Sequence, residues 1–181
     1  MSNIFNFTNG NEDINKIEEN LWLGNSFAAG NIRDLKEKGI TAILTVMNGS
    51  SNNYFHKEHG FYHKVIDIMD NESENIIQYF GECINFIRGN DKVLVHCGVG
   101  ASRSSTIVIA YLMWKYLMNF DDTFKFIKEK RPIACPNPGF QAQLKMFEKL
   151  LIDNNYDIDK INFKNINWIP PISTHNYYRY Y

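Results

Sequence analysis

One stretch of sequence decides the fold: Val93-Leu94-Val95-His96-Cys97-Gly98-Val99-Gly100-Ala101-Ser102-Arg103-Ser104-Ser105. Its first three residues are apolar, and two of them are β-branched, which predicts a short buried strand. Small residues follow, and an apolar pattern at helical spacing begins at Ser104. A strand, a tight loop and a helix start in this order can bind an anion. Successive backbone N–H groups point inward, and the positive end of the helix dipole lies behind them.

Two side chains give this predicted loop its chemistry. Cys97 is the first residue of the loop, where N–H donors, the helix start and a nearby guanidinium favour a nucleophilic thiolate. Arg103 closes the loop, and its planar fork suits two phosphate oxygens at once. A lone cysteine after a strand is more often a buried hydrophobe. Core filling, however, needs neither the two glycines nor the arginine that follow it. The pattern therefore indicates attack of a thiolate on a phosphoryl group.

The composition is that of a soluble globular chain with room for one domain and its core. The chain has 181 residues, of which 44% are hydrophobic and 22% charged, and its net charge is −1. No broad basic field is available to attract nucleic acid or an anionic membrane, so we expect neither as a partner. Any preference for phosphate must be local.

The cysteine content and the N-terminal sequence bear on the compartment. Cys83, Cys97 and Cys135 are irregularly spaced, so they predict neither a disulfide framework nor a zinc site. No secretory signal and no apolar run long enough to cross a bilayer are visible. A reducing compartment is therefore expected, cytoplasmic or nuclear.

Strands and helices alternate along the chain. This alternation predicts an α/β domain with a central, mostly parallel or mixed sheet and helices on both faces. Strands are expected at 21–24, 41–46, 62–69 and 93–95, and helices at 28–38, 76–87, from 104, from 121 to before Pro132, and 140–151.

The central stretch fits His-Cys-x-x-Gly-x-x-Arg-Ser, and it resembles the signature of the cysteine-dependent protein tyrosine phosphatase superfamily. Its Gly-Ala-Ser-Arg-Ser-Ser ending most resembles the dual-specificity branch, here as a small, atypical member. The resemblance implies a catalytic domain over 16–152. Residues 1–15, rich in Asn, Ser and acidic groups, are expected to form a loose leader, and 153–181 an aromatic-rich extension beyond the domain. That extension could pack along the domain, dock a partner or be disordered, and we expect it to pack against the domain. The other motifs that carry the resemblance are Leu21-Trp22-Leu23-Gly24, Ala110-Tyr111-Leu112-Met113, Arg131-Pro132, Pro136-Asn137 and Phe140-x-x-Gln143-Leu144.

The resemblance also implies roles for single residues. Cys97 is the expected nucleophile, and Ser104 is expected to hydrogen-bond the departing thiolate. Asn137 resembles an asparagine that braces the loop from outside. His96 either orients the loop by hydrogen bonding or is simply a satisfied buried histidine. The expected substrate-binding residues are Gly98, Val99, Gly100, Ala101, Ser102, Arg103 and Arg131, the last for a second substrate phosphate.

Expelling the leaving oxygen needs a proton donor. The resemblance implies an aspartate on a loop that follows a strand upstream of the cysteine, and both Asp67 and Asp70 qualify. Matching Asn75-Ile76-x-x-Tyr79-Phe80 to the next helix of the family favours Asp70, because Asp67 then falls inside a strand. The same carboxylate would afterwards activate water. Asp70-Asn71-Glu72 could instead be a solvated turn that caps the next helix, and one aspartate can serve both roles.

The loop composition bears on the substrate. Positions 98–102 are uncharged, which points to a phosphoprotein rather than a multiply charged headgroup. Ser104-Ser105 and the lack of a pocket-deepening loop predict a shallow site open to phosphotyrosine, phosphoserine and phosphothreonine. The alternatives are an RNA 5′-triphosphatase, a glucan or lipid phosphatase, and a phosphoprotein-binding pseudophosphatase. No cofactor or metal is expected, because His56 and His59 read as surface histidines on a loop. The sequence leaves the oligomeric state open.

Overall fold

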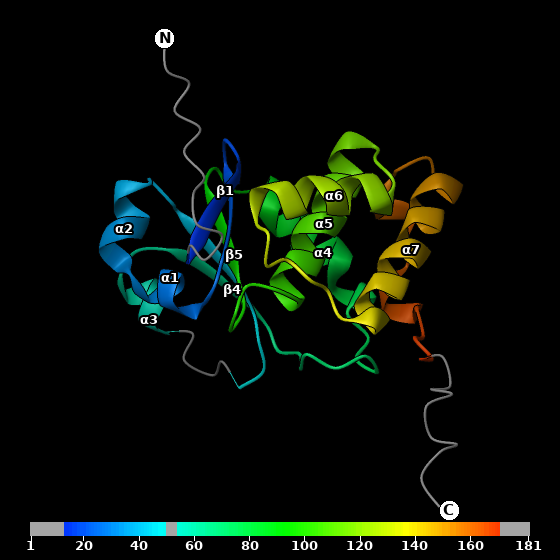
Figure 1. Ribbon diagram of the computed structural model, residues 1–181, viewed down its shortest axis with the longest axis horizontal. Helices are drawn as coiled ribbons and strands as arrows, with labels where there is room; N and C mark the ends of the chain where they lie inside the picture. The colour runs from blue at the N-terminus through cyan, green and yellow to red at the C-terminus, as the bar shows by residue number, and fades with distance from the viewer. Residues whose placement is uncertain (1–12, 50–53, 171–181) are drawn as a thin grey trace, which may run out of the picture.

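The computed structural model describes residues 13–49 and 54–170, in which a five-stranded sheet lies between two groups of helices (Figure 1). The strand order is β1-β2-β5-β3-β4, which places β5 in the middle. β1 runs antiparallel to β2, and all other neighbouring strands are parallel, so the predicted mixed, mostly parallel sheet is confirmed. The strands are β1 (Ile14–Glu18), β2 (Leu21–Gly24), β3 (Ala42–Val46), β4 (Tyr62–Ile66) and β5 (Val93–His96).

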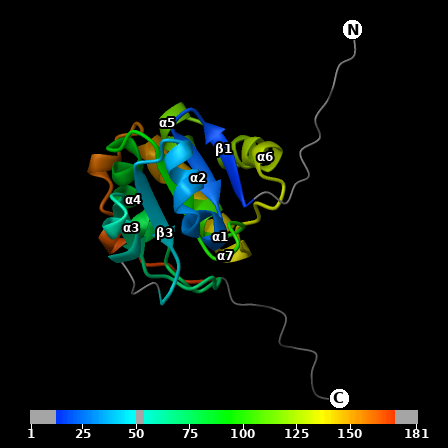
Figure 2. The same cartoon turned by 90° about the vertical axis from the view of Figure 1, so that its left-hand side faces the viewer.

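The two faces of the sheet carry helices of different length. Three short helices cover one face, which is turned toward the viewer in Figure 2: α1 (Ser26–Gly30), α2 (Ile32–Glu37) and α3 (Tyr54–Glu58). Four longer helices cover the other: α4 (Phe80–Arg88), α5 (Arg103–Tyr116), α6 (Phe120–Lys130) and α7 (Pro138–Asp153). Single 3₁₀ turns lie at Ile77–Tyr79, Ile158–Lys160 and Phe163–Asn165.

The hydrophobic core is divided by the sheet into two clusters. Successive side chains of a strand point to opposite faces. In β5, Leu94 therefore belongs to the smaller cluster under α1 and α2, whereas Val93 and Val95 belong to the larger one under α4–α7. Both faces of the central strand are covered, which explains why its sequence is apolar without alternation.

Helix α5 lies at the centre of the larger layer, in contact with α4, α6 and α7. All of its residues from Ser104 to Met113 are buried, as expected of a helix surrounded by others. Among the described helices, none combines the length and the apolar character needed to cross a membrane. Since α5 begins directly after the loop that follows β5, a fully buried strand and a mostly buried helix together fix the ends of that loop.

Several element boundaries differ from the prediction. The helix predicted over 28–38 is two helices, because Asn25 and Asn31 each accept a backbone N–H bond at a helix start and so begin separate turns. The strand predicted over 62–69 ends at Ile66. β1 begins at Ile14 and therefore takes the last residues of the predicted leader into the sheet. The rest of that leader, residues 1–12, lies outside the described residues.

The parallel strands bring four loops together. β2, β3, β4 and β5 all point the same way, so the segments that follow their carboxyl ends meet at one edge of the sheet. Ser26, Asn48, Asp70 and Cys97 each lie in one of these segments. The predicted site residues therefore meet at this edge of the sheet.

Candidate active site

The sulfur of Cys97 lies at the bottom of a cradle made by the loop between β5 and α5. The residue is 1% exposed. The Gly100 N–H and the Ser104 hydroxyl each donate to Cys97 Sγ over 3.2 Å. Both donors point at the sulfur, which therefore acts as a hydrogen-bond acceptor and not only as core filling. The structure thus places Ser104 where the sequence predicted a partner of the thiolate.

The loop faces its N–H groups inward because its carbonyls are bound from behind. Ser26 donates to Gly98 O through both its N–H and its hydroxyl, at 3.2 and 3.1 Å. The Cys135 N–H donates to Ala101 O over 2.7 Å, and the Thr106 N–H donates to Ser102 O over 2.9 Å. The N–H and the C=O of a peptide unit point in opposite directions. Carbonyls bound on the outside therefore turn the N–H groups toward the sulfur, which is the geometry of an anion-binding nest.

Gly100 is the residue on which the turn of this loop depends. Its φ of +76° is one that other residues rarely adopt. A Cβ at this position would also lie 2.4 Å from Gly24 O, at the end of β2. The loop therefore needs glycine here for both its backbone angle and its close packing on the sheet.

The structure corrects the role predicted for Arg131. This side chain is 1% exposed, beneath the loop. Its Nε donates to Gly100 O over 2.7 Å and its Nη2 to Val99 O over 3.1 Å, while Nη1 donates to Asn15 Oδ1. A guanidinium bound to loop carbonyls on the side away from the cradle does not meet a second substrate phosphate. Arg131 instead supports the loop, and no sequence signal could have shown this, because its partners there are backbone atoms.

Arg103, the first residue of α5, lies beside the cradle. Its Nη1 donates to Asn48 Oδ1 over 3.2 Å and to Ile68 O over 3.3 Å, which fixes the plane of the guanidinium. Its Nε is buried and has no hydrogen-bond partner among the described residues. A buried donor left unpaired costs about 1–3 kcal/mol, so an incoming anion oxygen would relieve that cost.

Of the two candidate acids, Asp70 is the one next to Arg103. Asp70 Oδ2 lies 3.7 Å from Arg103 Nε, whereas Oδ1 accepts bonds from Ser102 Oγ at 2.6 Å and Asn137 Nδ2 at 2.9 Å. Asp67 is exposed, and its Oδ1 accepts a bond from the Gly49 N–H over 3.3 Å. The structure therefore places Asp70, and not Asp67, at the mouth of the cradle.

Asn137 joins three parts of the site. Besides its bond to Asp70, its N–H donates to Ser102 Oγ over 3.1 Å. Its Oδ1 accepts the Phe140 N–H over 2.9 Å and so caps α7. The cap of a long helix thereby fixes the distance between the carboxylate and the loop, which agrees with the predicted bracing position.

His96 is buried directly before the nucleophile. Its Nε2 lies 2.7 Å from Thr45 Oγ1, and its Nδ1 lies 3.4 Å from Cys97 O. Burial lowers the pKa of His96 to about 4, so the imidazole is neutral at pH 7. Both ring nitrogens of His96 thus have a hydrogen-bond partner, and one of these partners is the loop carbonyl of Cys97. Thr45, which also lies 2.8 Å from His63 Nε2, is a supporting residue that the sequence reasoning missed.

The prediction for His56 is wrong, since this residue is neither on a loop nor on the surface. His56 lies in α3, is 9% exposed, and its Nε2 lies 2.9 Å from Ala29 O. Burial lowers its pKa as well. His59 is exposed, as predicted. In the described part of the chain no group of three or more His, Cys, Asp or Glu side chains is arranged to hold a metal ion.

The other two cysteines differ from Cys97 in their surroundings. Cys83 is wholly buried in the core on α4, and burial raises the pKa of its thiol. Cys135 is exposed. Only Cys97, among the three, has its sulfur hydrogen-bonded by donors that the described residues supply. The Gly100 N–H and the Ser104 hydroxyl at this sulfur, with the guanidinium of Arg103 beside them, can bind an anion, and such a cradle around a cysteine is typical of the cysteine-based phosphatases.

Comparison with known proteins gives the family. The model of the dual specificity phosphatase catalytic domain matches residues 21–150. Dual specificity protein phosphatase 1 of Arabidopsis thaliana is 46% identical over 137 residues, which cover 74% of this chain and 68% of that protein. Dual specificity protein phosphatase 1B of the same plant is 39% identical over 149 residues, covering 80% and 87%. The chain belongs to the dual specificity phosphatase family and is a protein phosphatase.

Solved structures agree on the fold. The human tyrosine phosphatase-like serine/threonine/tyrosine-interacting protein is 35% identical with a TM-score of 0.72, covering 77% of this chain and 97% of that one. PTPMT1, solved in complex with PI(5)P, has a TM-score of 0.71 at 17% identity and is alike in fold alone. The fold alone therefore does not define the substrate, which depends on the side chains of the site.

Proposed function

We propose that this phosphatase hydrolyses phosphotyrosine, phosphoserine and phosphothreonine in proteins through a phosphocysteine intermediate. The observation that carries the proposal is the hydrogen bonding of Cys97 Sγ by the Gly100 N–H and the Ser104 hydroxyl, both at 3.2 Å. Two donors on one sulfur, at the start of a helix, support a thiolate that is ready to attack.

In the first step the Cys97 thiolate attacks phosphorus in line with the leaving oxygen. The S–P bond forms as the P–O bond breaks, while the loop N–H groups and Arg103 Nε bind the equatorial oxygens. Asp70, protonated on Oδ2, gives its proton to the leaving oxygen. Its Oδ1 is already held by Ser102 and Asn137, so Oδ2 is the oxygen turned toward the cradle.

In the second step water hydrolyses the phosphocysteine. Asp70, now a carboxylate, takes a proton from the water as its oxygen attacks phosphorus and the S–P bond breaks. The Ser104 hydroxyl donates to the departing thiolate, from the position it already has 3.2 Å from the sulfur. Inorganic phosphate then leaves, and Asp70 carries the proton for the next cycle.

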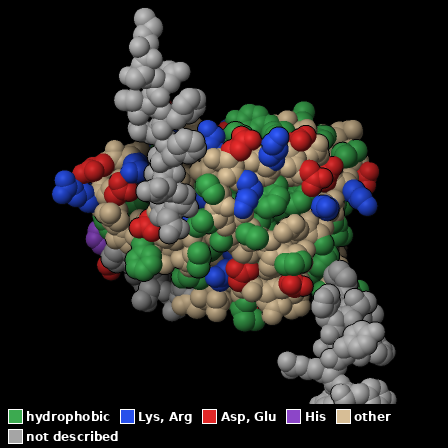
Figure 3. Space-filling model, viewed as in Figure 1, with side chains coloured by type: hydrophobic (Ala, Val, Ile, Leu, Met, Phe, Trp, Pro, Cys, Tyr) green, Lys and Arg blue, Asp and Glu red, His purple; other side chains and the backbone are tan. Residues whose placement is uncertain are grey.

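The mouth of the site supports a phosphoprotein substrate. Val99 of the loop is 66% exposed, Met69 beside Asp70 is 52% exposed, and Phe27, next to Ser26, is 77% exposed. Apolar side chains at the mouth suit the neighbours of a phosphorylated residue in a polypeptide better than a headgroup with several phosphates. Basic and acidic side chains alternate over the face drawn in Figure 3, which therefore offers no broad cationic surface.

Turnover of matched substrates tests the proposal. We expect the protein to hydrolyse a phosphotyrosine peptide and a phosphothreonine peptide with higher kcat/KM than a phosphoinositide or a 5′-triphosphorylated RNA. Cys97→Ser should abolish turnover, and Ser104→Ala should let an acid-stable phosphoenzyme accumulate, visible by mass spectrometry. Turnover by Cys97→Ser equal to that of the wild type would refute the covalent mechanism. A preference for the phosphoinositide or the RNA would refute the substrate class.

A further inference from the structure

The segment after α7 turns back toward the active site. We call residues 154–170 the strap. Asn155 and Tyr156 have φ values of +50° and +58°, so the chain reverses direction there. In Figure 1 the strap, in orange and red, returns beside α7 to the helix's N-terminal end, where the loop after β4 also arrives. The match to the family ends at residue 150, so the strap lies outside it.

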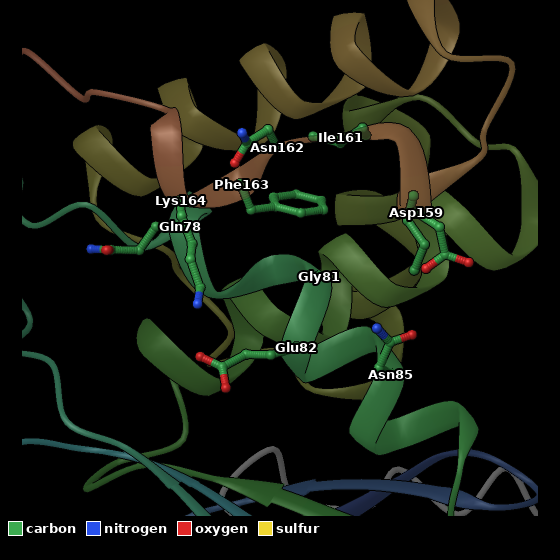
Figure 4. A pocket seen from close by; sticks show the side chains of 10 residues that line it. Gln78, Gly81, Glu82, Asn85, Asp159, Ile161, Asn162, Phe163 and Lys164 are labelled. Atoms are coloured by element: carbon green, nitrogen blue, oxygen red, sulfur yellow. The ribbon is translucent and has the colours of Figure 1, made fainter.

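The strap is anchored on α4 by an aromatic side chain. Figure 4 shows the Phe163 ring lying over Gly81, and a Cβ at Gly81 would come within 2.6 Å of that ring. Phe163 also packs on Phe147 of α7, with ring centroids 6.0 Å apart. A cavity of about 560 Å³ remains between the strap and α4, lined by polar residues such as Gln78 and Asn162. The anchor therefore depends on the absence of a side chain at residue 81.

Beyond this anchor, the strap reaches the loop that carries Asp70. We call residues 67–76 the acid loop. Trp168 Nε1 donates to Glu72 O over 2.9 Å, and Asn75 Nδ2 donates to Ile166 O over 2.7 Å. These two bonds join the end of the strap to the middle and the end of the acid loop.

The opposite side of the acid loop rests on α7. A Cβ at Gly139 would lie 2.2 Å from Glu72 O, so the loop backbone lies directly on the helix start. Gln143 donates to Glu74 O over 2.8 Å and accepts the Ile77 N–H over 3.0 Å. The carbonyl of Glu72 is thus confined between Gly139 on one side and Trp168 on the other.

We propose that the strap is a positioning element for the general acid, with Trp168 as its main contact. The proposal rests on the function proposed for Asp70. The acid loop contains no helix or strand, and its own backbone bonds, from Glu74 N to Asn71 O and from Ile76 N to Glu74 O, are local, so contacts from α7 and the strap fix it relative to the cradle. Glu72 lies two residues from Asp70, and fixing its carbonyl limits the rotation of the backbone that carries the carboxylate. Trp168 thereby keeps Oδ2 of Asp70 directed at the leaving oxygen.

A leaving-group comparison tests this positioning role. Trp168→Phe keeps an aromatic ring but removes the N–H that binds Glu72 O. An aryl phosphate with a basic leaving phenolate needs the proton, whereas a dinitrophenyl phosphate does not. We expect kcat on the first substrate to fall about fivefold, the equivalent of one lost neutral hydrogen bond, and kcat on the second to stay unchanged. In an Asp70→Asn background the same substitution should have no effect on either substrate.

Two further variants separate positioning from folding. Gly81→Ala, a substitution far from the active site, displaces the Phe163 ring and should give the same leaving-group dependence as Trp168→Phe. The thermal unfolding midpoint of each variant shows whether the fold is retained. Ile169→Ala, an exposed strap residue, is the matched control and should behave as the wild type. Equal losses on both substrates, no loss on either, or an undiminished effect in the Asp70→Asn background would each overturn the proposal. If Asp70→Asn alone shows no leaving-group dependence, the proposed acid fails, and the strap's role fails with it.

Discussion

The two loops of the active site are held in different ways. The cradle loop is bound through its backbone: the carbonyls from Gly98 to Ser102 each accept a hydrogen bond from a helix, a neighbouring loop or Arg131. The acid loop is held mainly by side chains of α7 and the strap. A loop whose backbone is hydrogen-bonded to packed elements at every residue cannot move without breaking several bonds together. A loop held by a few side chains can shift when one of those bonds breaks. The cradle is therefore preformed, and the acid loop is the adjustable part.

The strongest test of the preformed cradle is Gly100→Ala. The new Cβ would lie 2.4 Å from Gly24 O, at a φ of +76° that alanine rarely adopts. We expect kcat/KM to fall about a hundredfold or more on every substrate, as when a donor to a developing oxyanion is lost. Steady-state kinetics with a good and a poor leaving group would measure this.

Gly30→Ala is the control for that substitution, because nothing lies within 4 Å of its added Cβ. It should keep full activity. If Gly100→Ala slowed only the substrate with the poor leaving group, the cradle would not be the part that the substitution disturbs.

The acid loop is tested next, with Asp70→Asn. Removing the proton donor should lower kcat on a basic leaving group about a hundredfold. The loss on a dinitrophenyl leaving group should be small. KM should hold, because an amide oxygen in place of Oδ1 can still accept the bonds from Ser102 and Asn137. Asp67→Asn, three residues away and bound to the Gly49 N–H, should behave as the wild type. If Asp67→Asn lowered kcat in this way and Asp70→Asn did not, Asp67 would be the general acid.

Substituting Arg131 tests the support beneath the cradle. Arg131→Met removes the guanidinium donor from Val99 O and leaves Gly100 O with the 3.4 Å bond from the Ser105 hydroxyl. We expect the free energy of unfolding to fall by roughly 1–3 kcal/mol for each unpaired group, and kcat to fall about tenfold, as one lost charged bond would predict. The loss of kcat should be equal on singly and doubly phosphorylated peptides. Urea unfolding measures the change in stability, and steady-state kinetics measure the change in kcat.

Arg33→Met, at a surface ion pair with Glu37, is the matched control and should change neither quantity. A loss confined to the doubly phosphorylated peptide would restore the original prediction for Arg131, in which this side chain meets a second phosphate.

The contrast between the loops also explains what the sequence could and could not predict. The strand, the cradle and the start of α5 are contiguous, so their residue types alone specify the local geometry. Arg131 acts through backbone oxygens that any residue could supply, and its role depends on how α6 packs. The burial of His56 depends on the docking of α3, which periodicity does not reveal. The contact of Trp168 with Glu72 joins residues 96 positions apart.

The smallest expected effect concerns the buried histidine under the cradle. Burial lowers the pKa of His96 to about 4, from about 6.5 in the unfolded chain. Between pH 6.5 and pH 4, His96 is therefore protonated in the unfolded chain but neutral in the native state. The contribution to stability is complete above pH 6.5 and is lost toward pH 4, at up to about 1.4 kcal/mol per pH unit. His56, whose pKa burial also lowers, adds a loss of the same sign.

Urea unfolding at pH 7.5 and 5.5 would measure this contribution by comparing the wild type with His96→Asn. The loss of stability at the lower pH should be smaller in the variant, with a remainder from His56. Ile169→Ala, at an exposed side chain that does not titrate, should lose as much as the wild type. An identical pH dependence in all three proteins would mean that His96 takes up its proton in the folded state. In that case the contacts that fix Cys97 O and Thr45 Oγ1 would involve an imidazolium, and the cradle would rest on a charged group rather than a neutral one.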